Sequence, residues 1–310
     1  MKKIKMKHQQ KLTVEETFKL FIASSSAKGL TEKTLKTYQH HFNAVFKRAD
    51  STIDIADFSQ QQMNELIAEL RKEGLSDNSI SSYTRTLKAF FSWCNANGYT
   101  KFNISLYKAS EAIQETYTDE ELLILLEKPK KNCSFAEYRN WVIINFLINS
   151  GCRAKTIRNI QNQDVDLINH QIVLRHTKSR KSQVIPLCNE MAVILKNYMS
   201  VRNGSAEEYL FCNEFGGQMK ESGLRYAIIR YNTSRGVSKT SIHAFRHTFA
   251  RKYLIDCGGD AFTLQKIMGH STLAMTKHYC NIFNADIVKN YDKHSPLTQL
   301  SHSRGVAIKK

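Results

Sequence analysis

Residues 241–250 carry the side chains of this chain that are best suited to bind a phosphate. Their sequence, Ser-Ile-His-Ala-Phe-Arg-His-Thr-Phe-Ala, predicts a helix in which His243 and Arg246 lie one turn apart beside an apolar stripe. A phosphate needs charge-assisted donors that converge from one side, and an imidazole with a guanidinium supplies them. His243 and His247 also have the spacing of a metal site, but its zinc-protease form requires a Glu where this chain has Ala244. We therefore expect a phosphate site without a metal.

Three further segments offer groups that complete such a site. Arg153 directly follows an apolar helix, and His270 follows a glycine that suits a helix end. Tyr279 comes after one more predicted helical stretch. Lys178 lies in the basic tip of a predicted β-hairpin, whose strands are residues 172–174 and 183–185. If these groups form one site, the fold must bring them together, because the chain separates them widely.

In this order, the motifs resemble those of the tyrosine recombinases, also called the phage integrase family. The family's three boxes are similar to Gly151-x-Arg153, to His243-x-x-Arg246, and to Gly269-His270 followed by Tyr279. The hairpin at 177–187 resembles the turn that carries the family's catalytic lysine, and residues 29–38 with the helix 79–98 resemble its N-terminal core-binding domain. No single motif is specific, but all of them in this order make the resemblance strong over most of the chain.

The resemblance implies a covalent mechanism in which Tyr279 is the nucleophile. Tyr279 would attack the scissile phosphorus of DNA and leave a 3′-phosphotyrosine and a free 5′-hydroxyl. Strand exchange without an energy source must conserve the energy of the broken phosphodiester, and a phosphotyrosine ester conserves it. Because arginines supply the positive charge, we expect no cofactor, nucleotide or metal, and the sequence has no Gly-rich phosphate loop.

The same resemblance assigns roles to the other matched residues. Arg153 and Arg246 would bind the non-bridging oxygens, where negative charge is distributed in the transition state. His243 and His270 would donate to these oxygens or relay the tyrosine proton. The adjacent His247 is expected to be a packing or surface residue.

Two positions leave details of the site open. Lys178 would protonate the leaving 5′-oxygen, but Arg180 and Lys181 are so close in the chain that this choice rests on the resemblance. Thr156 stands three residues after Arg153, where the family usually carries an acid that supports the site. Because Thr accepts a hydrogen bond but supplies no charge, we expect this support to come from elsewhere.

The composition favours a polyanionic partner. The 310 residues include 45 Lys and Arg against 28 Asp and Glu, which gives a formal net charge of +17 and a pI near 9.5. Double-stranded DNA is the first candidate for such a partner.

The seven cysteines contain no Cys-x-x-Cys pair, which argues against a disulfide framework or structural zinc. No secretory signal and no apolar run near the roughly 20 residues of a membrane span is present, so we expect a cytoplasmic protein without a membrane partner.

We predict a mainly α-helical chain of two domains. Capping signals at Thr13, Thr31, Ser59 and Ser76 each precede an amphipathic stripe, which predicts an N-terminal four-helix core-binding (SAM-like) bundle. A mixed, mostly helical catalytic domain with a small β-sheet or hairpin follows, with helical patterns from Glu190 to about Tyr291. The predicted divisions are a basic lead at 1–11, the core-binding domain at 12–97, a linker at 98–116, the catalytic domain at 117–295 and a tail at 296–310.

A predicted last helix carries the apolar residues Phe283, Ile287, Val288 and Tyr291. It would pack on its own domain or, as the resemblance implies, dock on a neighbouring copy. A synapse that cuts and rejoins strands in pairs through a Holliday junction needs four copies on DNA, and in solution we expect a monomer or weak oligomer. The length leaves no room for a separate arm-binding domain, which favours a compact Xer-like or transposon-type integrase.

Three other functions remain open on the residues alone. A DNA-binding protein of the same fold that no longer cleaves, for which Thr156 is the hint, would form no covalent complex. A type IB topoisomerase-like enzyme would relax supercoiled DNA of any sequence as a monomer. A His-dependent metallohydrolase would lose its activity in a chelator.

We predict that binding of duplex DNA weakens steeply with salt. Each phosphate that a Lys or Arg neutralises releases counterions and adds about −0.9 to the slope of log K against log salt concentration. Fluorescence anisotropy of a labelled duplex at several salt concentrations measures this slope. A flat response would contradict the inference from charge.

Overall fold

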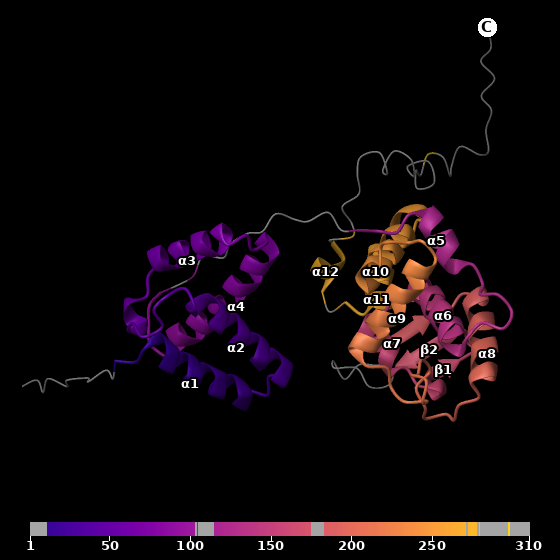
Figure 1. The fold of residues 1–310 in the computed structure, drawn as a ribbon, viewed down its shortest axis with the longest axis horizontal. Helices are drawn as coiled ribbons and strands as arrows, with labels where there is room; N and C mark the ends of the chain where they lie inside the picture. Colours follow the sequence, from indigo (N-terminus) through magenta and orange to yellow (C-terminus); the bar gives the residue numbers. More distant parts are fainter. Residues whose placement is uncertain are drawn as a thin grey trace, which may run out of the picture. The chain divides into compact units, whose positions relative to one another are not determined.

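The computed structural model describes residues 11–102, 104, 115–174, 183–270, 272–277, 279 and 297. The chain divides into two compact units, Met1–Ala112 and Ile113–Lys310. Both units are mostly helical, and a small sheet lies in the second (Figure 1). The mainly α-helical fold predicted from the sequence is therefore confirmed.

The first unit begins each of its helices at a hydroxyl side chain. Its helices are α1 (Val14–Ala27), α2 (Glu32–Phe46), α3 (Gln60–Lys72) and α4 (Asp77–Ala96), with a short 3₁₀ turn η1 (Ile55–Asp57). The side chain of each predicted N-cap accepts a hydrogen bond from the backbone N–H three residues later; these caps are Thr13, Thr31, Ser59 and Ser76. Each cap satisfies a backbone donor that the first turn would otherwise leave without a partner.

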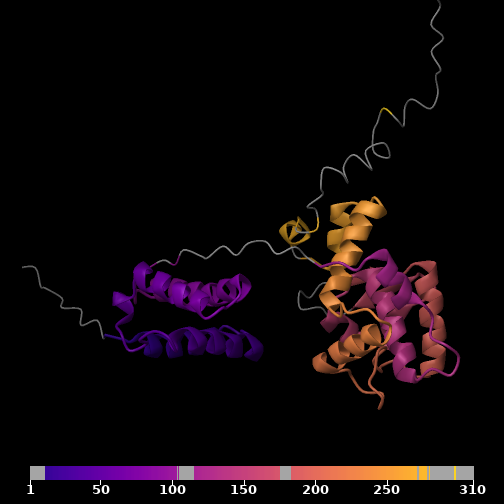
Figure 2. The same ribbon diagram turned by 45° about the horizontal axis from the view of Figure 1, so that its top comes forward.

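Aromatic rings fill the core of the first unit. The Phe18 ring stacks on Phe42 with centroids 3.8 Å apart and meets the edge of Phe90 at 5.3 Å. Figure 2 shows α1 and α2 in one layer and α3 and α4 in the other. Phe90 on α4 is fully buried, so it lies where the two layers meet.

The second unit is built from short helices around one long buried helix. Its helices are α5 (Asp119–Leu126), α6 (Phe135–Ser150), α7 (Ala154–Asn159), α8 (Asn189–Arg202), α9 (Glu221–Ser234), α10 (Ile242–Arg251), α11 (Ala261–Met268) and α12 (Leu273–Lys277). A 3₁₀ turn η2 (Asn162–Asp164) precedes the sheet, and a π-helical turn η3 (Lys252–Asp256) follows α10. The sequence of α6 is apolar on nearly all sides, and Val142 to Ile144, Phe146 and Leu147 are fully buried.

The sheet confirms the predicted hairpin and adds a strand. β2 (Gln171–Leu174) pairs antiparallel with β3 (Gln183–Pro186), and Ile172 faces Ile185 in the core. The strand β1 (Val165–Asp166) pairs with β2 and was not predicted, because two residues are too short to show an alternating pattern. The hairpin tip, with Lys178, lies outside the described residues, as does the predicted helix that contains Phe283 to Tyr291.

The prediction of continuous helical patterns after Glu190 is wrong for residues 203–220. There the chain leaves α8 at Asn203, which takes the left-handed conformation (φ 49°). It then forms isolated bridges between Gln161 and Tyr209 and between Cys212 and Gln218 before α9 begins. The Asn-Gly pair at 203–204 is a turn signal that ends a helix.

Within the described residues, no helix is both long enough and apolar enough to cross a membrane.

We predict that Phe90→Ala destabilises the first unit by about 3–5 kcal/mol, because it leaves a cavity in a fully buried aromatic core. Trp93 lies in the first unit and Trp141 in the second, so a Trp141→Phe background makes tryptophan fluorescence report on the first unit alone. Urea unfolding in this background measures the change. Leu20→Ala, at a position 43% exposed, is the control, and equal losses for the two variants would contradict the packing described.

Candidate active site

The buried Arg246 is held at the end of the central helix. Its Nη1 donates to the carbonyl oxygen of Gly151 at 2.6 Å, and its Nη2 donates to that of Met268 at 3.2 Å. Gly151 ends α6 in the left-handed conformation (φ 57°), where glycine is preferred, and a β-carbon there would overlap the ring of Phe249. A glycine at the end of α6 therefore permits the approach of α10 that brings Arg246 to this carbonyl.

Arg153 shares the Met268 carbonyl oxygen with Arg246. Its Nη1 donates to Met268 O at 3.3 Å and to Gly269 O at 3.0 Å. These oxygens belong to the last turn of α11, where carbonyl groups have no partner within the helix and the helix dipole is negative. The two guanidinium groups thus lie side by side on the end of α11.

The charges of the two arginines are not neutralised by any acidic side chain that the structure describes. Within the described residues, neither Arg153 nor Arg246 forms an ion pair with a carboxylate. Burial lowers the pKa of Arg246, and the charge of Arg153 lowers it further, whereas the neighbouring Tyr279 hydroxyl raises it. A buried guanidinium beside a half-buried one, both bonded to neutral acceptors among the described residues, favours an anion with several oxygens, such as a phosphate.

His270 is bonded on both ring nitrogens. Its Nε2 lies 2.5 Å from Arg246 Nη2, and its Nδ1 lies 2.8 Å from the hydroxyl of Thr276. A guanidinium has only donors, so Nε2 accepts and the ring proton of the neutral imidazole is assigned to Nδ1, which donates to Thr276. Burial, followed by the charges of Arg246 and Arg153, lowers the pKa of His270 to about 4.

The ring of Tyr279 lies close to the imidazoles of His270 and His247. It is nearly parallel to the ring of His270, with centroids 5.9 Å apart and 7° between planes, and its centroid lies 5.2 Å from that of His247. It also packs on a small apolar cluster formed by α10 and α11, whose buried members are Phe249, Ala250, Leu264 and Met268. The structure therefore brings Arg153, Arg246, His270 and Tyr279 together.

The remaining predicted residues are placed differently. His243 is exposed one turn before Arg246 and makes no hydrogen bond within the described part of the chain. Lys178 lies outside the described residues. Thr156 is half-buried on α7, and the contacts that hold Arg153 come from carbonyl groups of α11 instead. Among the described residues, no three His, Cys, Asp or Glu side chains converge as a metal site.

His247, expected to be a packing or surface residue, packs on the ring of Tyr279, and its buried Nδ1 has no hydrogen-bond partner in the described structure. Sequence reasoning missed two contributors to this site. Thr276 accepts from Nδ1–H of His270, and Met268 contributes its backbone carbonyl. Side-chain type carries no information about a backbone acceptor, so no signal in the sequence pointed to Met268.

Two family matches cover most of the chain. Residues 115–285 match the phage integrase family, and residues 19–98 match the N-terminal SAM-like domain of phage integrases. The chain belongs to the phage integrase family, as its motifs predicted. The function predicted with that family, a tyrosine recombinase, is confirmed as well.

Individual relatives agree with this assignment. The chain is 26% identical over 285 residues to the tyrosine recombinase XerC of Thermodesulfovibrio yellowstonii, which covers 88% of this chain and 93% of XerC. Its fold is similar to that of the Tn1549 transposon integrase in complex with transposon right end DNA, with a TM-score of 0.73 and 19% identity over 92% of this chain and 99% of the integrase. A λ integrase tetramer bound to a Holliday junction is similar with a TM-score of 0.69 and 16% identity, covering 87% of this chain and 78% of λ integrase.

We predict that the burial of neutral His270 makes stability fall as the pH is lowered from about 6.5 to about 4. The unfolded chain protonates this imidazole near its ordinary pKa of 6.5 while the folded chain resists protonation to about 4, so acid favours unfolding within this window. His270→Gln should flatten the pH dependence of the free energy of unfolding by on the order of 2 kcal/mol. The lowered pKa values of His41 and His247 leave a residual slope.

Urea unfolding between pH 4 and 7 measures this slope for the unmodified chain and the variant. His243→Gln is the control, because His243 is exposed. An unchanged slope in His270→Gln would contradict a neutral, buried imidazole at this position.

Proposed function

We propose that this chain binds duplex DNA and cuts and rejoins it at specific sites through a covalent bond between Tyr279 and a 3′-phosphate. One observation supports this most: two guanidinium groups share the Met268 carbonyl with no carboxylate partner among the described residues, and the phenol of Tyr279 lies next to Arg246. This arrangement supplies positive charge for a phosphate and a nucleophile within one site.

The two arginines bind the phosphate that is attacked. Arg246 is almost completely buried (5% exposed), so its orientation is set by the protein before DNA arrives. Arg153 is half-buried and presents its charge from the other side of the shared carbonyl. In the reaction, a bond forms between Tyr279 Oη and phosphorus while the bond to the 5′-oxygen breaks, and the arginines stabilise the negative charge on the non-bridging oxygens.

The histidines hold and move protons. Neutral His270 orients the Arg246 guanidinium through Nε2; when its bond to Arg246 is exchanged, this nitrogen is able to accept the phenol proton and, once protonated, to donate to the phosphate. His243, exposed one turn before Arg246, is available to the same phosphate oxygens. Rejoining reverses these steps: the free 5′-hydroxyl attacks and Tyr279 leaves with a proton.

The leaving 5′-oxygen takes its proton from Lys178 in this proposal. Lys178 is in the chain between Leu174 and Gln183, which form the last described rung of the β2–β3 hairpin. Gln183 Nε2 donates to the carbonyl oxygen of Ile267 at 2.9 Å, so this end of the hairpin is fastened beside the carbonyl groups that hold both arginines. The position of the hairpin supports the assignment.

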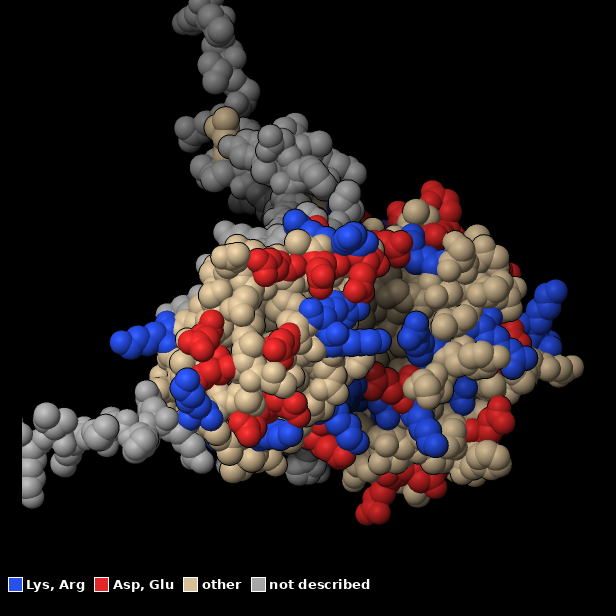
Figure 3. Space-filling model, turned by 60° about the vertical axis from the view of Figure 1, so that its left-hand side comes forward, with Lys and Arg blue, Asp and Glu red and all other residues tan. Residues whose placement is uncertain are grey.

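DNA binding and assembly belong to the same proposal. The net charge of +17 supports a polyanionic partner, and on the face shown in Figure 3 basic side chains are interspersed with acidic ones. λ integrase, which is similar in fold, is a tetramer on a Holliday junction. We infer that four copies of this chain act together on DNA, with the segment around Phe283 to Tyr291 docking between copies, and that the reaction takes place in the cytoplasm.

A nicked suicide duplex tests the proposal. Candidate sites come from footprinting on the DNA that flanks the gene, and cleavage traps the covalent complex because the short 5′ fragment diffuses away. The unmodified chain should form a complex that resists denaturing electrophoresis, and Tyr279→Phe should form none because it lacks the attacking oxygen.

Tyr226→Phe, at a position 66% exposed on α9, is the matched control and should cleave normally. A covalent complex with Tyr279→Phe would assign another nucleophile. No complex with the unmodified chain at a footprinted site would favour a binding protein that does not cleave.

A further inference from the structure

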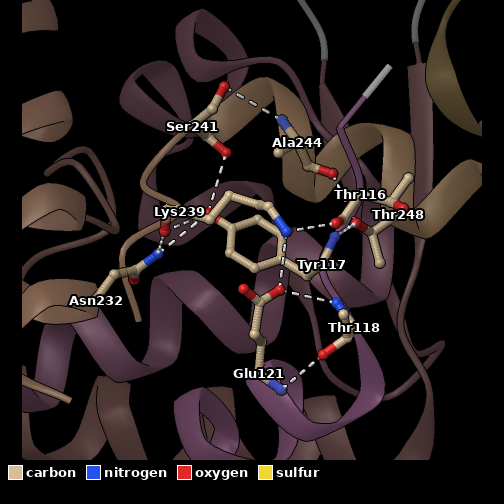
Figure 4. A network of polar contacts seen from close by, with 9 residues as sticks. All are labelled: Thr116, Tyr117, Thr118, Glu121, Asn232, Lys239, Ser241, Ala244 and Thr248. Carbon is tan, nitrogen blue, oxygen red and sulfur yellow. Dashed lines mark hydrogen bonds and ion pairs between the residues drawn. The ribbon is translucent and has the colours of Figure 1, made fainter. Parts of the chain in front are cut away.

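A buried polar network joins the start of the second unit to α10, the helix that carries Arg246. Figure 4 shows its residues around Tyr117, which lies just before α5. Tyr117 is 3% exposed, and its ring stacks on that of Phe245 with centroids 4.0 Å apart. Because Phe245 directly precedes Arg246 on α10, this contact supports the helix next to the site.

The Tyr117 hydroxyl is bonded at the beginning of α10. It donates to the carbonyl oxygens of Lys239 at 3.1 Å and Ser241 at 3.4 Å, and it accepts from Asn232 Nδ2 at 3.1 Å. Ser241 is the N-cap of α10. Burial raises the pKa of Tyr117 well above its usual range, so the hydroxyl stays protonated and remains a donor.

The backbone of Tyr117 is bonded further along the same helix. Its N–H donates to the Thr248 hydroxyl at 2.8 Å, and that hydroxyl donates to Ala244 O at 2.8 Å. Tyr117 thus contacts α10 at its N-cap, Ser241, and again two turns later at Thr248. Contacts at both places restrict translation along the helix axis as well as rotation about it.

Lys239 completes the network from the loop before α10. Its Nζ donates to Thr116 O at 2.7 Å and to Glu121 Oε2 at 3.0 Å, and Glu121 closes the capping box of α5 with Thr118. The segment 116–121 and the segment 239–248 are therefore joined by side-chain hydrogen bonds in both directions (Figure 4). Asn232 Oδ1 has no hydrogen-bond partner among the described residues, but Asn232 Nδ2 and the Tyr117 hydroxyl are bonded and hold the two segments together.

We propose that Tyr117 is a positioning residue for DNA cleavage: through its hydroxyl and backbone N–H it sets the place of α10 and hence of Arg246 beside the Met268 carbonyl. The proposal rests on the phosphate-binding role proposed for Arg246. The hydrogen bonds of Tyr117 go to residues 239, 241, 232 and 248 and not to Arg246 itself, so Tyr117 acts through the helix. Displacement of a catalytic group by about 1 Å is enough to reduce a rate by roughly 100-fold.

Single-turnover cleavage of the suicide duplex by Tyr117→Phe tests the inference. The substitution keeps the ring on Phe245 and removes only the hydroxyl, so the cleavage rate at saturating DNA should fall roughly tenfold while the Kd for DNA changes less than about twofold. The matched control is Tyr198→Phe on α8, which removes an equally buried hydroxyl that donates to Leu210 O at 3.0 Å. It should lower the melting temperature by a similar amount and leave the rate unchanged.

A second pair of variants tests the hydrogen bond from the Tyr117 backbone N–H to Thr248 and does not depend on how well Tyr117→Phe folds. Thr248→Val deletes the acceptor of the Tyr117 N–H and should slow cleavage, whereas Thr248→Ser keeps the hydroxyl and should restore the rate. The inference is overturned if Tyr117→Phe and Thr248→Val cleave at the unmodified rate, or lose no more rate than Tyr198→Phe does at an equal loss of melting temperature.

Arg246→Lys separates this inference from the proposed function. If Arg246→Lys cleaves normally, the role proposed for Arg246 is wrong, whatever the Tyr117 variants do. If Arg246→Lys is inactive while Tyr117→Phe cleaves normally, the proposed function stands and Tyr117 has only a structural role.

Discussion

The carbonyl oxygen of Met268 accepts hydrogen bonds from both Arg153 and Arg246, and the arrangement of the site depends on this shared acceptor. Two cations side by side repel each other, and the pKa of Arg246 is lowered first by burial and then by the charge of Arg153. A carboxylate between them would relieve it but would also cancel the charge that a phosphate requires. A backbone carbonyl at the negative end of a helix holds both groups and leaves their charge available.

The Met268 carbonyl oxygen lies between the arginines because α6 and α11 both end at this place and α10 runs past it. α6 ends at Gly151, α11 ends at Gly269, and α10 passes between these ends with Arg246 facing inward. Both glycines take positive φ angles, which turn the chain away at once and leave the last carbonyl groups of each helix without partners in that helix. The arginines use these carbonyl groups, so the features that end the helices also build the site. His270, directly after Gly269, joins the same group through Arg246.

Much of the local structure could be predicted because it depends on neighbours in the chain. The capping signals at Thr13, Thr31, Ser59 and Ser76 were sufficient to place the starts of α1, α2, α3 and α4. The β2–β3 hairpin followed from its apolar runs. The strand β1 and the irregular chain at 203–220 could not be predicted, since two-residue strands and isolated bridges are stabilised by partners elsewhere in the unit.

The sequence by itself determined which groups lie together in the second unit and their order in the chain: two arginines, a histidine after a glycine and a tyrosine one short helix later. It also determined that the chain is mainly helical and belongs to the phage integrase family. Only the tertiary structure decided how these groups are held. The shared Met268 carbonyl, the Nδ1–H tautomer of His270, the packing of His247 on Tyr279 and the bonds from Tyr117 to α10 are all properties of contacts. Most of them join residues far apart in the chain or use backbone atoms that every residue has, and for this reason no local pattern of side chains records them.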